Sequence, residues 1–266
     1  MSIAAFRRLH ESGCFVIPNA WDAGSAAMLQ HLGFPAIATT SAGYAWSLAR
    51  RDNQVGLGPV LSHLRLLVDT VDVPINADFE GGFAVDPEDI AVHVTLGVGT
   101  GVAGLSIEDS TGDPASPLFD FALAVERIAA ARAAIDTSGT GVFLTGRSEG
   151  FIVGRPDIDE TIRRLRAYAD AGADCLFAPG IRTPAHISAI VEAVAPKPVN
   201  VVVSADFTTV QALADAGVRR ISVGGALARV AWAAFMTAAR EIKEGGNFAQ
   251  LEAAAPFSAI EAAFKT

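Results

Sequence analysis

The sequence predicts a (β/α)8 barrel, and three observations support this fold class. The chain has 266 residues, 51% of them hydrophobic and 18% charged, which is enough for one large α/β core. Eight short apolar runs alternate with longer alanine-rich stretches of helical spacing. The middle of each run is fully apolar, which is typical of parallel strands covered on their outer face. We therefore expect one closed barrel domain that spans residues 1–266.

The predicted strands end in small or polar residues, which mark turns from strand to helix. In chain order the strands cover residues 14–21, 36–41, 73–80, 102–109, 141–147, 174–180, 199–204 and 220–225. This regular order of units favours a closed barrel over an open sheet.

Helix signals lie between these strands. Asp86 precedes Pro87, and a proline that follows a capping residue is typical of the first position of a helix. The stretches 157–174 and 206–220 both contain Asp-Ala-Gly directly before a strand. Glycine at that place indicates the end of a helix.

The last twenty residues, 247–266, contain apolar helical segments beyond the eighth unit. A helix with an apolar face has to bury that face, and a second subunit could cover it. We therefore expect a homo-oligomer, either a dimer or a tetramer.

Composition excludes several classes of protein. The net charge is −9 and no large basic cluster occurs, so a nucleic-acid partner is not expected. No apolar run reaches membrane-spanning length and the first residues lack a signal-peptide block, so we expect a cytoplasmic protein without a membrane partner. Cys14 and Cys175 lie in apolar runs and are interpreted as reduced core thiols.

Acidic side chains gather where the predicted strands end, which is where barrel enzymes place their chemistry. They are Asp52, Asp78, Glu80, Glu108 and Glu149. Like charges this close would raise one another's pKa, and a divalent cation would relieve the repulsion. Oxygen ligands without histidine or cysteine favour Mg²⁺ or Mn²⁺ over Zn²⁺. The alternative is that these acids cap helices or pair with Arg147.

Lysine is absent from every predicted strand end, since the chain contains only Lys197, Lys243 and Lys265. A Schiff-base mechanism needs such a lysine, so enolate chemistry here would have to use a metal. Residues 222–225, Ser-Val-Gly-Gly, form either a phosphate cradle or a close turn between strand and helix.

Several motifs together resemble the isocitrate lyase/phosphoenolpyruvate mutase superfamily, over nearly the whole chain. They are TTSAGYA at 39–45, NADFEGGF at 76–83, GLSIEDS at 104–110, GRSEGF at 146–151 and AGADCLFAPG at 171–180. The resemblance implies a (β/α)8 barrel whose extra C-terminal helix is exchanged between subunits. It also implies Mg²⁺ and a small carboxylate substrate, an α-oxo acid or its enolate.

The resemblance also implies roles for individual residues. The metal would be held, partly through water, by Asp78, Glu80 and Glu108. The substrate would be bound by Trp21, Ser41, Ala42, Gly43, Arg147 and Asn200. The catalytic residues would be Asp52, Arg147 and Glu108, because an arginine and a metal can neutralise the charge of a developing enolate.

The loop at residues 109–120 departs from the superfamily. Isocitrate and methylisocitrate lyases carry a loop of the Lys-Lys-Cys-Gly-His type after the fourth strand, and its cysteine donates a proton. Phosphonate-processing members have a gating loop with lysine and asparagine. Residues 109–120 contain no Cys, Lys, His or Asn, so the general acid is not identified.

The resemblance implies a Mg²⁺-dependent carbon–carbon lyase for a small α-oxo or α-hydroxy di- or tricarboxylate. It would cleave or decarboxylate that acid through a metal-bound enolate. One alternative is P–C bond chemistry, as in a phosphonopyruvate mutase or hydrolase. Another is a non-catalytic member that binds an oxo-acid.

Overall fold

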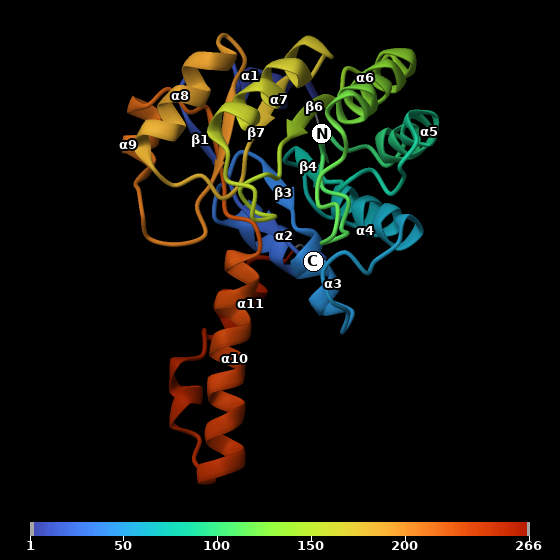
Figure 1. Ribbon diagram of the computed structural model, residues 1–266. Helices are drawn as coiled ribbons and strands as arrows, with labels where there is room; N and C mark the ends of the chain where they lie inside the picture. Colours follow the sequence, from blue (N-terminus) through green and yellow to red (C-terminus); the bar gives the residue numbers. More distant parts are fainter. Residues whose placement is uncertain (1–2, 265–266) are drawn as a thin grey trace.

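A computed structural model describes residues 3–264 and confirms the predicted barrel. In this part of the chain nine parallel strands follow the order β1-β9-β8-β7-β6-β5-β4-β3-β2. Helices surround these strands (Figure 1). β1 (Phe15–Ile17) and β2 (Asn19–Ala20) are two parts of the first predicted strand. They flank Pro18, which has no N–H to donate to a neighbouring strand. Because β1 pairs with β9 and β2 with β3, the sheet closes.

The other strands lie inside their predicted ranges, and each of them stops before its predicted polar end except β6, which ends at Arg147 as predicted. They are β3 (Ile37–Thr39), β4 (Ile75–Asp78), β5 (Gly104–Glu108), β6 (Phe143–Arg147), β7 (Cys175–Phe177), β8 (Val199–Val202) and β9 (Arg220–Ser222).

Helices follow the strands as the alternation predicts. They are α1 (Ile3–Leu9), α2 (Ala23–His31), α3 (Ser41–Ser47), α4 (Leu57–Thr70), α5 (Pro87–Val98), α6 (Phe121–Ser138), α7 (Ile158–Asp170), α8 (Pro184–Val194), α9 (Val210–Asp215), α10 (Ala226–Gly245), η1 (Ala249–Ala253) and α11 (Phe257–Glu261). Among residues 3–264 no helix combines the length and apolar character that a membrane span needs.

The predicted helix boundaries are confirmed. Pro87 is the first residue of α5, although the Asp86 side chain makes no capping hydrogen bond. Gly172 and Gly217 follow α7 and α9 with φ angles of 103° and 84°, a region that side chains disfavour.

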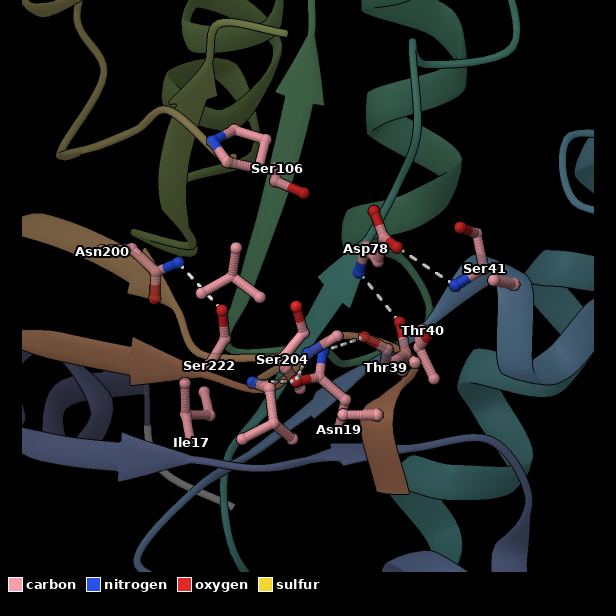
Figure 2. Close-up of a pocket in the computed structure, with 18 of the residues that line it drawn as sticks. Ile17, Asn19, Thr39, Thr40, Ser41, Asp78, Ser106, Asn200, Ser204 and Ser222 are labelled. Atoms are coloured by element: carbon pink, nitrogen blue, oxygen red, sulfur yellow. Dashed lines mark hydrogen bonds between the residues drawn. The ribbon is translucent and has the colours of Figure 1, made fainter. Parts of the chain in front are cut away.

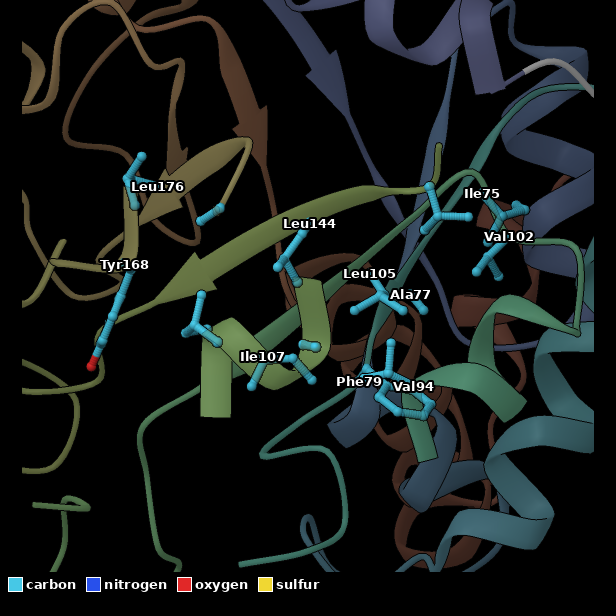
Figure 3. Packing of buried hydrophobic residues seen from close by; sticks show 14 of the residues in the cluster. Ile75, Ala77, Phe79, Val94, Val102, Leu105, Ile107, Leu144, Tyr168 and Leu176 are labelled. Atoms are coloured by element: carbon cyan, nitrogen blue, oxygen red, sulfur yellow. The ribbon is translucent and has the colours of Figure 1, made fainter. Parts of the chain in front are cut away.

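The two faces of the barrel wall differ in character. Side chains such as Ile75, Leu105 and Leu144 point outward and pack under the surrounding helices (Figure 3). Alternate residues point inward because side chains alternate along a strand. At the amino-terminal end α1 closes the barrel, where Phe6 packs edge-on against Phe143. The carboxyl-terminal end is left for polar groups.

α10 leaves the barrel instead of packing on it, and the chain beyond it returns toward the barrel (Figure 1). Ala228 is the buried residue that this 20-residue helix contributes. Large apolar side chains on it are exposed, including Val230 and Phe235 at 67% and 62%. The helical segments predicted in 247–266 are η1 and α11, while Lys265 lies outside the described residues.

The end of α7 provides a test of backbone strain. Replacement of Gly172 by alanine forces a side chain into φ 103° and places Cβ 2.5 Å from Arg132 Cγ. We expect it to lower the free energy of unfolding by about 1–3 kcal/mol. Urea denaturation followed by circular dichroism measures this.

Gly58 in the exposed first turn of α4 is the matched control, because nothing lies within 4 Å of an added Cβ there. Gly58→Ala should be neutral or slightly stabilising. Equal losses at both positions would contradict this account of Gly172.

Candidate active site

A cavity of about 290 Å³ opens at the carboxyl ends of the strands. Six of the sequence-predicted site residues line it: Ser41, Ala42, Asp52, Asp78, Arg147 and Asn200. Figure 2 shows Asp78 and Ser41 on one side of this pocket and Asn200 on another. The barrel therefore brings together residues that are far apart in the sequence.

Asp78, the last residue of β4, is held from several directions. Its backbone N–H donates to Thr39 Oγ1 at 2.8 Å. Its Oδ2 accepts from the backbone N–H of Ser41 at 3.0 Å, and its Oδ1 accepts from Arg147 Nη1 at 3.2 Å. The carboxylate is therefore fixed at the edge of the cavity.

Arg147, the last residue of β6, is shared by three carboxylates. Its Nη1 lies 3.2 Å from both Asp78 Oδ1 and Glu108 Oε2, and its Nε donates to Glu149. Parallel pairing places Glu108 directly beside Arg147. Burial alone would lower the pKa of Arg147, but Glu108, Glu149 and Asp78 together raise it. The guanidinium therefore stays charged.

One arginine does not neutralise the surrounding acids. Burial raises the pKa of Glu80 to about 8, and Asp78 and Asp52 add to the effect. Burial also raises the pKa of Glu108 well above its usual value, although Arg147 opposes this. The rim therefore has carboxyl groups that would gain from a further cation.

Glu80 lies in a tight turn, where its φ of 48° is unusual for a residue with a side chain. The turn is held by Arg127 of α6, which donates to the carbonyl oxygens of Gly81, Ala84 and Val85. The motif Asp-Phe-Glu-Gly-Gly thus forms a strand end followed by a constrained loop.

The chemistry of these donors fits Mg²⁺. Among residues 3–264 no three acidic, histidine or cysteine side chains are close enough together to hold a metal ion directly. Mg²⁺ commonly uses one or two carboxylates and keeps several waters. Of the three predicted metal residues, Asp78 lines the cavity, whereas Glu80 and Glu108 are not among its lining residues.

The start of α3 holds three of the predicted substrate-binding residues. Ser41 donates its N–H to Asp78, and Gly43 donates its N–H to Thr40 Oγ1 at 3.3 Å. Ser41 and Ala42 line the cavity, while Gly43 is buried outside its lining. The described hydrogen bonds thus leave the N–H of Ala42 open for a ligand.

Asp52 lines the cavity from the loop before α4. Partial burial raises its pKa, and Asp78 raises it further. Trp21 lies elsewhere, in a surface hollow shared with Trp232 and Phe235 of α10. Trp46 lines the cavity instead. Sequence reasoning missed Trp46, because it stands within a helix and follows no strand end.

Several cavity residues deeper in the barrel were also missed, among them Asn76, Ser106 and Arg220. The sequence does contain a signal for Asn76 and Ser106, because side chains two positions apart on a strand point in the same direction. Asn76 stands two residues before Asp78, and Ser106 two before Glu108, so each shares the inward direction of its neighbour.

The hydrogen bonds of residues 222–225 distinguish between a phosphate cradle and a close turn, the two interpretations of this stretch. The N–H groups of Val223 and Gly224 donate to Asn19 Oδ1 at 2.9 and 2.8 Å. These amides are engaged within the protein, which supports a close turn and not a phosphate cradle. Lys197 precedes β8 and Lys243 lies on α10, so neither is at a strand end.

The loop at 109–120 starts from a buried anchor. Asp109 accepts hydrogen bonds from Tyr168 Oη at 2.6 Å and Arg164 Nη1 at 3.1 Å, and from the N–H of Glu149 at 2.7 Å. Ser110 then pairs with Leu118 in an isolated bridge. No residue of this loop lines the cavity.

Comparison with known proteins agrees with this geometry. The family described as phosphoenolpyruvate phosphomutase matches residues 6–243. The uncharacterised protein Rv1998c of Mycobacterium tuberculosis is 32% identical over 97% of this chain and 95% of its own. The 2-methylisocitrate lyase of Escherichia coli is 31% identical over 60% of this chain and 55% of its own.

Solved structures show the same similarity. A candidate lyase/mutase from Burkholderia cenocepacia J2315 is 45% identical, with a TM-score of 0.94 over 98% of this chain and 94% of its own. Oxaloacetate acetylhydrolase with oxalate is 25% identical, with a TM-score of 0.86 over 98% and 93% of the two chains. Phosphonopyruvate hydrolase with oxalate and Mg²⁺ is 26% identical, with a TM-score of 0.85 over 98% and 94%.

The raised pKa of Glu80 leads to a prediction about stability in the absence of metal. Folded Glu80 binds its proton up to about pH 8, whereas its ordinary value is 4.5. The contribution of protonated Glu80 to the free energy of unfolding is therefore fully present below about pH 4.5 and is lost as the pH rises toward 8. The free energy of unfolding, measured with urea in the presence of chelator, should fall between pH 5 and 8.

Glu80→Gln should remove that part of the slope, because glutamine does not titrate. An unchanged slope in this variant would contradict the assignment to Glu80.

Proposed function

The chain belongs to the phosphoenolpyruvate phosphomutase family, and from that premise we propose that it is a Mg²⁺-dependent lyase of a small α-oxo or α-hydroxy di- or tricarboxylate. The proposed reaction is cleavage of a C–C bond or decarboxylation, which leaves an enolate. One observation carries this proposal: a fixed carboxylate, Asp78, faces the cavity beside an arginine that three acids share. Such a site offers both metal ligands and a donor for a developing oxyanion.

The proposed metal site consists of Asp78, with Glu80 and Glu108 acting through bound water. Mg²⁺, or Mn²⁺, would act there as a Lewis acid for the oxygen that gains negative charge. The related phosphonopyruvate hydrolase was crystallised with oxalate and Mg²⁺, which supports this choice of ion. The raised pKa values of Glu80 and Glu108 agree with a place for an added cation.

The protein's own groups would bind and orient the acid. Arg147 donates to the substrate oxygen, since its position at the end of β6 places it on the cavity. The N–H of Ala42 donates to a substrate carboxylate, and Asn200 binds from the opposite wall. Asp52 orients the ligand from its loop. Trp21 lies away from the cavity, so Trp46 takes the place proposed for an aromatic wall.

The choice among reactions depends on the loop at 109–120, which has no Cys, Lys or His. Decarboxylation of an oxo-acid needs a sink for electrons, in which the enolate forms as CO2 leaves, but less acid catalysis. We therefore favour decarboxylation or a related C–C lyase reaction. P–C bond chemistry is the second candidate, because phosphonopyruvate hydrolase is among the similar structures. A non-catalytic protein that binds an oxo-acid is the third.

An assay of metal-dependent turnover on a panel of oxo-acids, hydroxy-acids and phosphonopyruvate tests these candidates. Asp78→Asn should lower kcat/KM by roughly 100-fold or more, because loss of even an outer-shell partner of a metal commonly costs 10–100-fold. Asp89→Asn, at an exposed acid on α5, should leave the rate unchanged.

Full activity of Asp78→Asn would contradict the proposed metal site. Faster turnover of phosphonopyruvate than of every carboxylate would favour the second candidate. Binding of oxalate without any turnover would favour the third.

We also propose that the protein is a homo-oligomer and that α10 makes the contact between subunits. This helix buries Ala228 but exposes Val230, Phe235 and Met236 to solvent. An exposed apolar surface of this kind is typical of an interface. Exchange of α10 between two copies would cover it.

The mass of the protein in solution, from light scattering after size exclusion, tests this proposal. Phe235→Asp should shift the oligomer toward the monomer, because it places a charge in the apolar contact. Leu66→Asp, at a similarly exposed leucine on α4, should leave the mass unchanged. A wild-type monomer would contradict the proposal.

A further inference from the structure

The inside of the barrel is polar one layer below the rim. Barrel interiors are usually filled by branched apolar side chains in layers. Here the layer consists largely of buried polar residues: Asn76, Ser106, Thr145, Asn200, Arg220 and Ser222. All of them except Thr145 line the same cavity as Asp78. Figure 2 shows Ser106, Asn200 and Ser222 in this cavity. The cavity therefore continues from the rim into a polar chamber.

Arg220 is the charged member of this chamber, and it is 3% exposed. Its three partners are neutral: Asn200 Oδ1 at 2.9 Å, Thr145 Oγ1 at 3.0 Å and His10 Nε2 at 3.4 Å. Among residues 3–264 no carboxylate lies within ion-pair distance of it. Burial lowers its pKa. A buried charge without a counter-ion is costly, so the chamber favours an anion.

Asn76 supplies a second, independent sign of a ligand. It is 6% exposed, and its Oδ1 is buried without a hydrogen-bond partner. Its Nδ2 reaches only Ala77 O, at 3.5 Å. Buried polar atoms are nearly always satisfied by protein or bound molecules. The unpartnered Oδ1 of this cavity-lining residue therefore points to a polar occupant.

Within the described part of the chain, three arginines line the cavity: Arg147, Arg220 and Arg229 of α10. Arg147 and Arg220 belong to the barrel wall and lie at different depths. Thr145, which accepts from Arg220, stands two residues before Arg147 on β6. Two residues of a strand span about 6.6 Å. This spacing suits an elongated acid with an anionic group at each end, one at the rim and one in the chamber.

We propose that Arg220 and Asn76 form a deep subsite for the second carboxylate of a four- or five-carbon dicarboxylate. One carboxylate lies at the rim with Asp78 and Arg147. The other pairs with Arg220, and Asn76 Oδ1 accepts from a hydroxyl or water that accompanies it. This inference rests on the proposed function and narrows the substrate class to dicarboxylates of that length.

The test compares two ligands that differ only in the far carboxylate, 2-oxoglutarate and 2-oxovalerate. Calorimetry on the full chain with Mg²⁺ should give at least about tenfold tighter binding of the dicarboxylate, as expected for a charge-assisted hydrogen bond. Arg220→Met should bring the ratio of affinities close to one. Oxalate, which is too short to reach the chamber, should bind this variant as it binds the wild type.

Thr145→Val is the matched control. This variant removes one hydrogen bond of Arg220 and leaves the guanidinium in place. Thr145 itself does not line the cavity. The ratio of the affinities for 2-oxoglutarate and 2-oxovalerate should stay close to its wild-type value in this variant. A ratio near one in the wild type, an unchanged ratio in Arg220→Met, or equal loss in Thr145→Val would overturn the subsite.

If Arg220→Met does not fold, Asn76→Asp tests the same point. A new carboxylate on the chamber wall should lower the ratio by about tenfold, through repulsion and competition for Arg220. An unchanged ratio would overturn the subsite. Thermal stabilisation of the wild type by chloride without any preference for the dicarboxylate would also overturn it, since an inorganic anion would then fill the chamber.

The affinity for oxalate keeps this result separate from the proposed function. Oxalate binding that does not respond to Mg²⁺ would count against the rim site. The ratio between 2-oxoglutarate and 2-oxovalerate reports on the chamber alone.

Discussion

The Arg147 guanidinium and the acids around it are the interaction on which the site depends. Asp78, Glu108 and Glu149 come from three strand ends, and each lies within ion-pair distance of this one cation. The parallel register places Glu108 beside Arg147, so the pairing of neighbouring strands β4, β5 and β6 creates the cluster. Because one positive charge serves several acids, carboxyl groups nearby keep raised pKa values. That imbalance supports the Mg²⁺ site proposed for the rim.

Most of the fold could be predicted from the sequence, because it depends on local patterns. Apolar runs, the Asp86-Pro87 start and the glycines after α7 and α9 each act over a few residues. The path of α10 could not be predicted in this way. Its alanine-rich pattern is that of any barrel helix, and only the structure shows that it leaves the wall. The split at Pro18 was a smaller miss with a local cause.

The candidate site was predictable at its rim and not in its interior. Acids at strand ends are conspicuous, since charge is costly in a core. Trp21 was expected at the pocket from the family resemblance, but it lies in a hollow beside α10, and Trp46 lines the cavity. Asn76 and Arg220 lie within runs read as apolar strand bodies. Their inward direction and shared chamber depend on register between strands, which a single sequence does not reveal.

The central claim is that Asp78 directly binds a divalent cation at the edge of this cavity. A crystal structure of the protein soaked with Mn²⁺ and oxalate, with anomalous diffraction data, tests it most directly. The account predicts an anomalous peak in direct contact with an Asp78 carboxylate oxygen, with oxalate between that ion and Arg147. Absence of a peak at Asp78, or a peak only at another site, would contradict it.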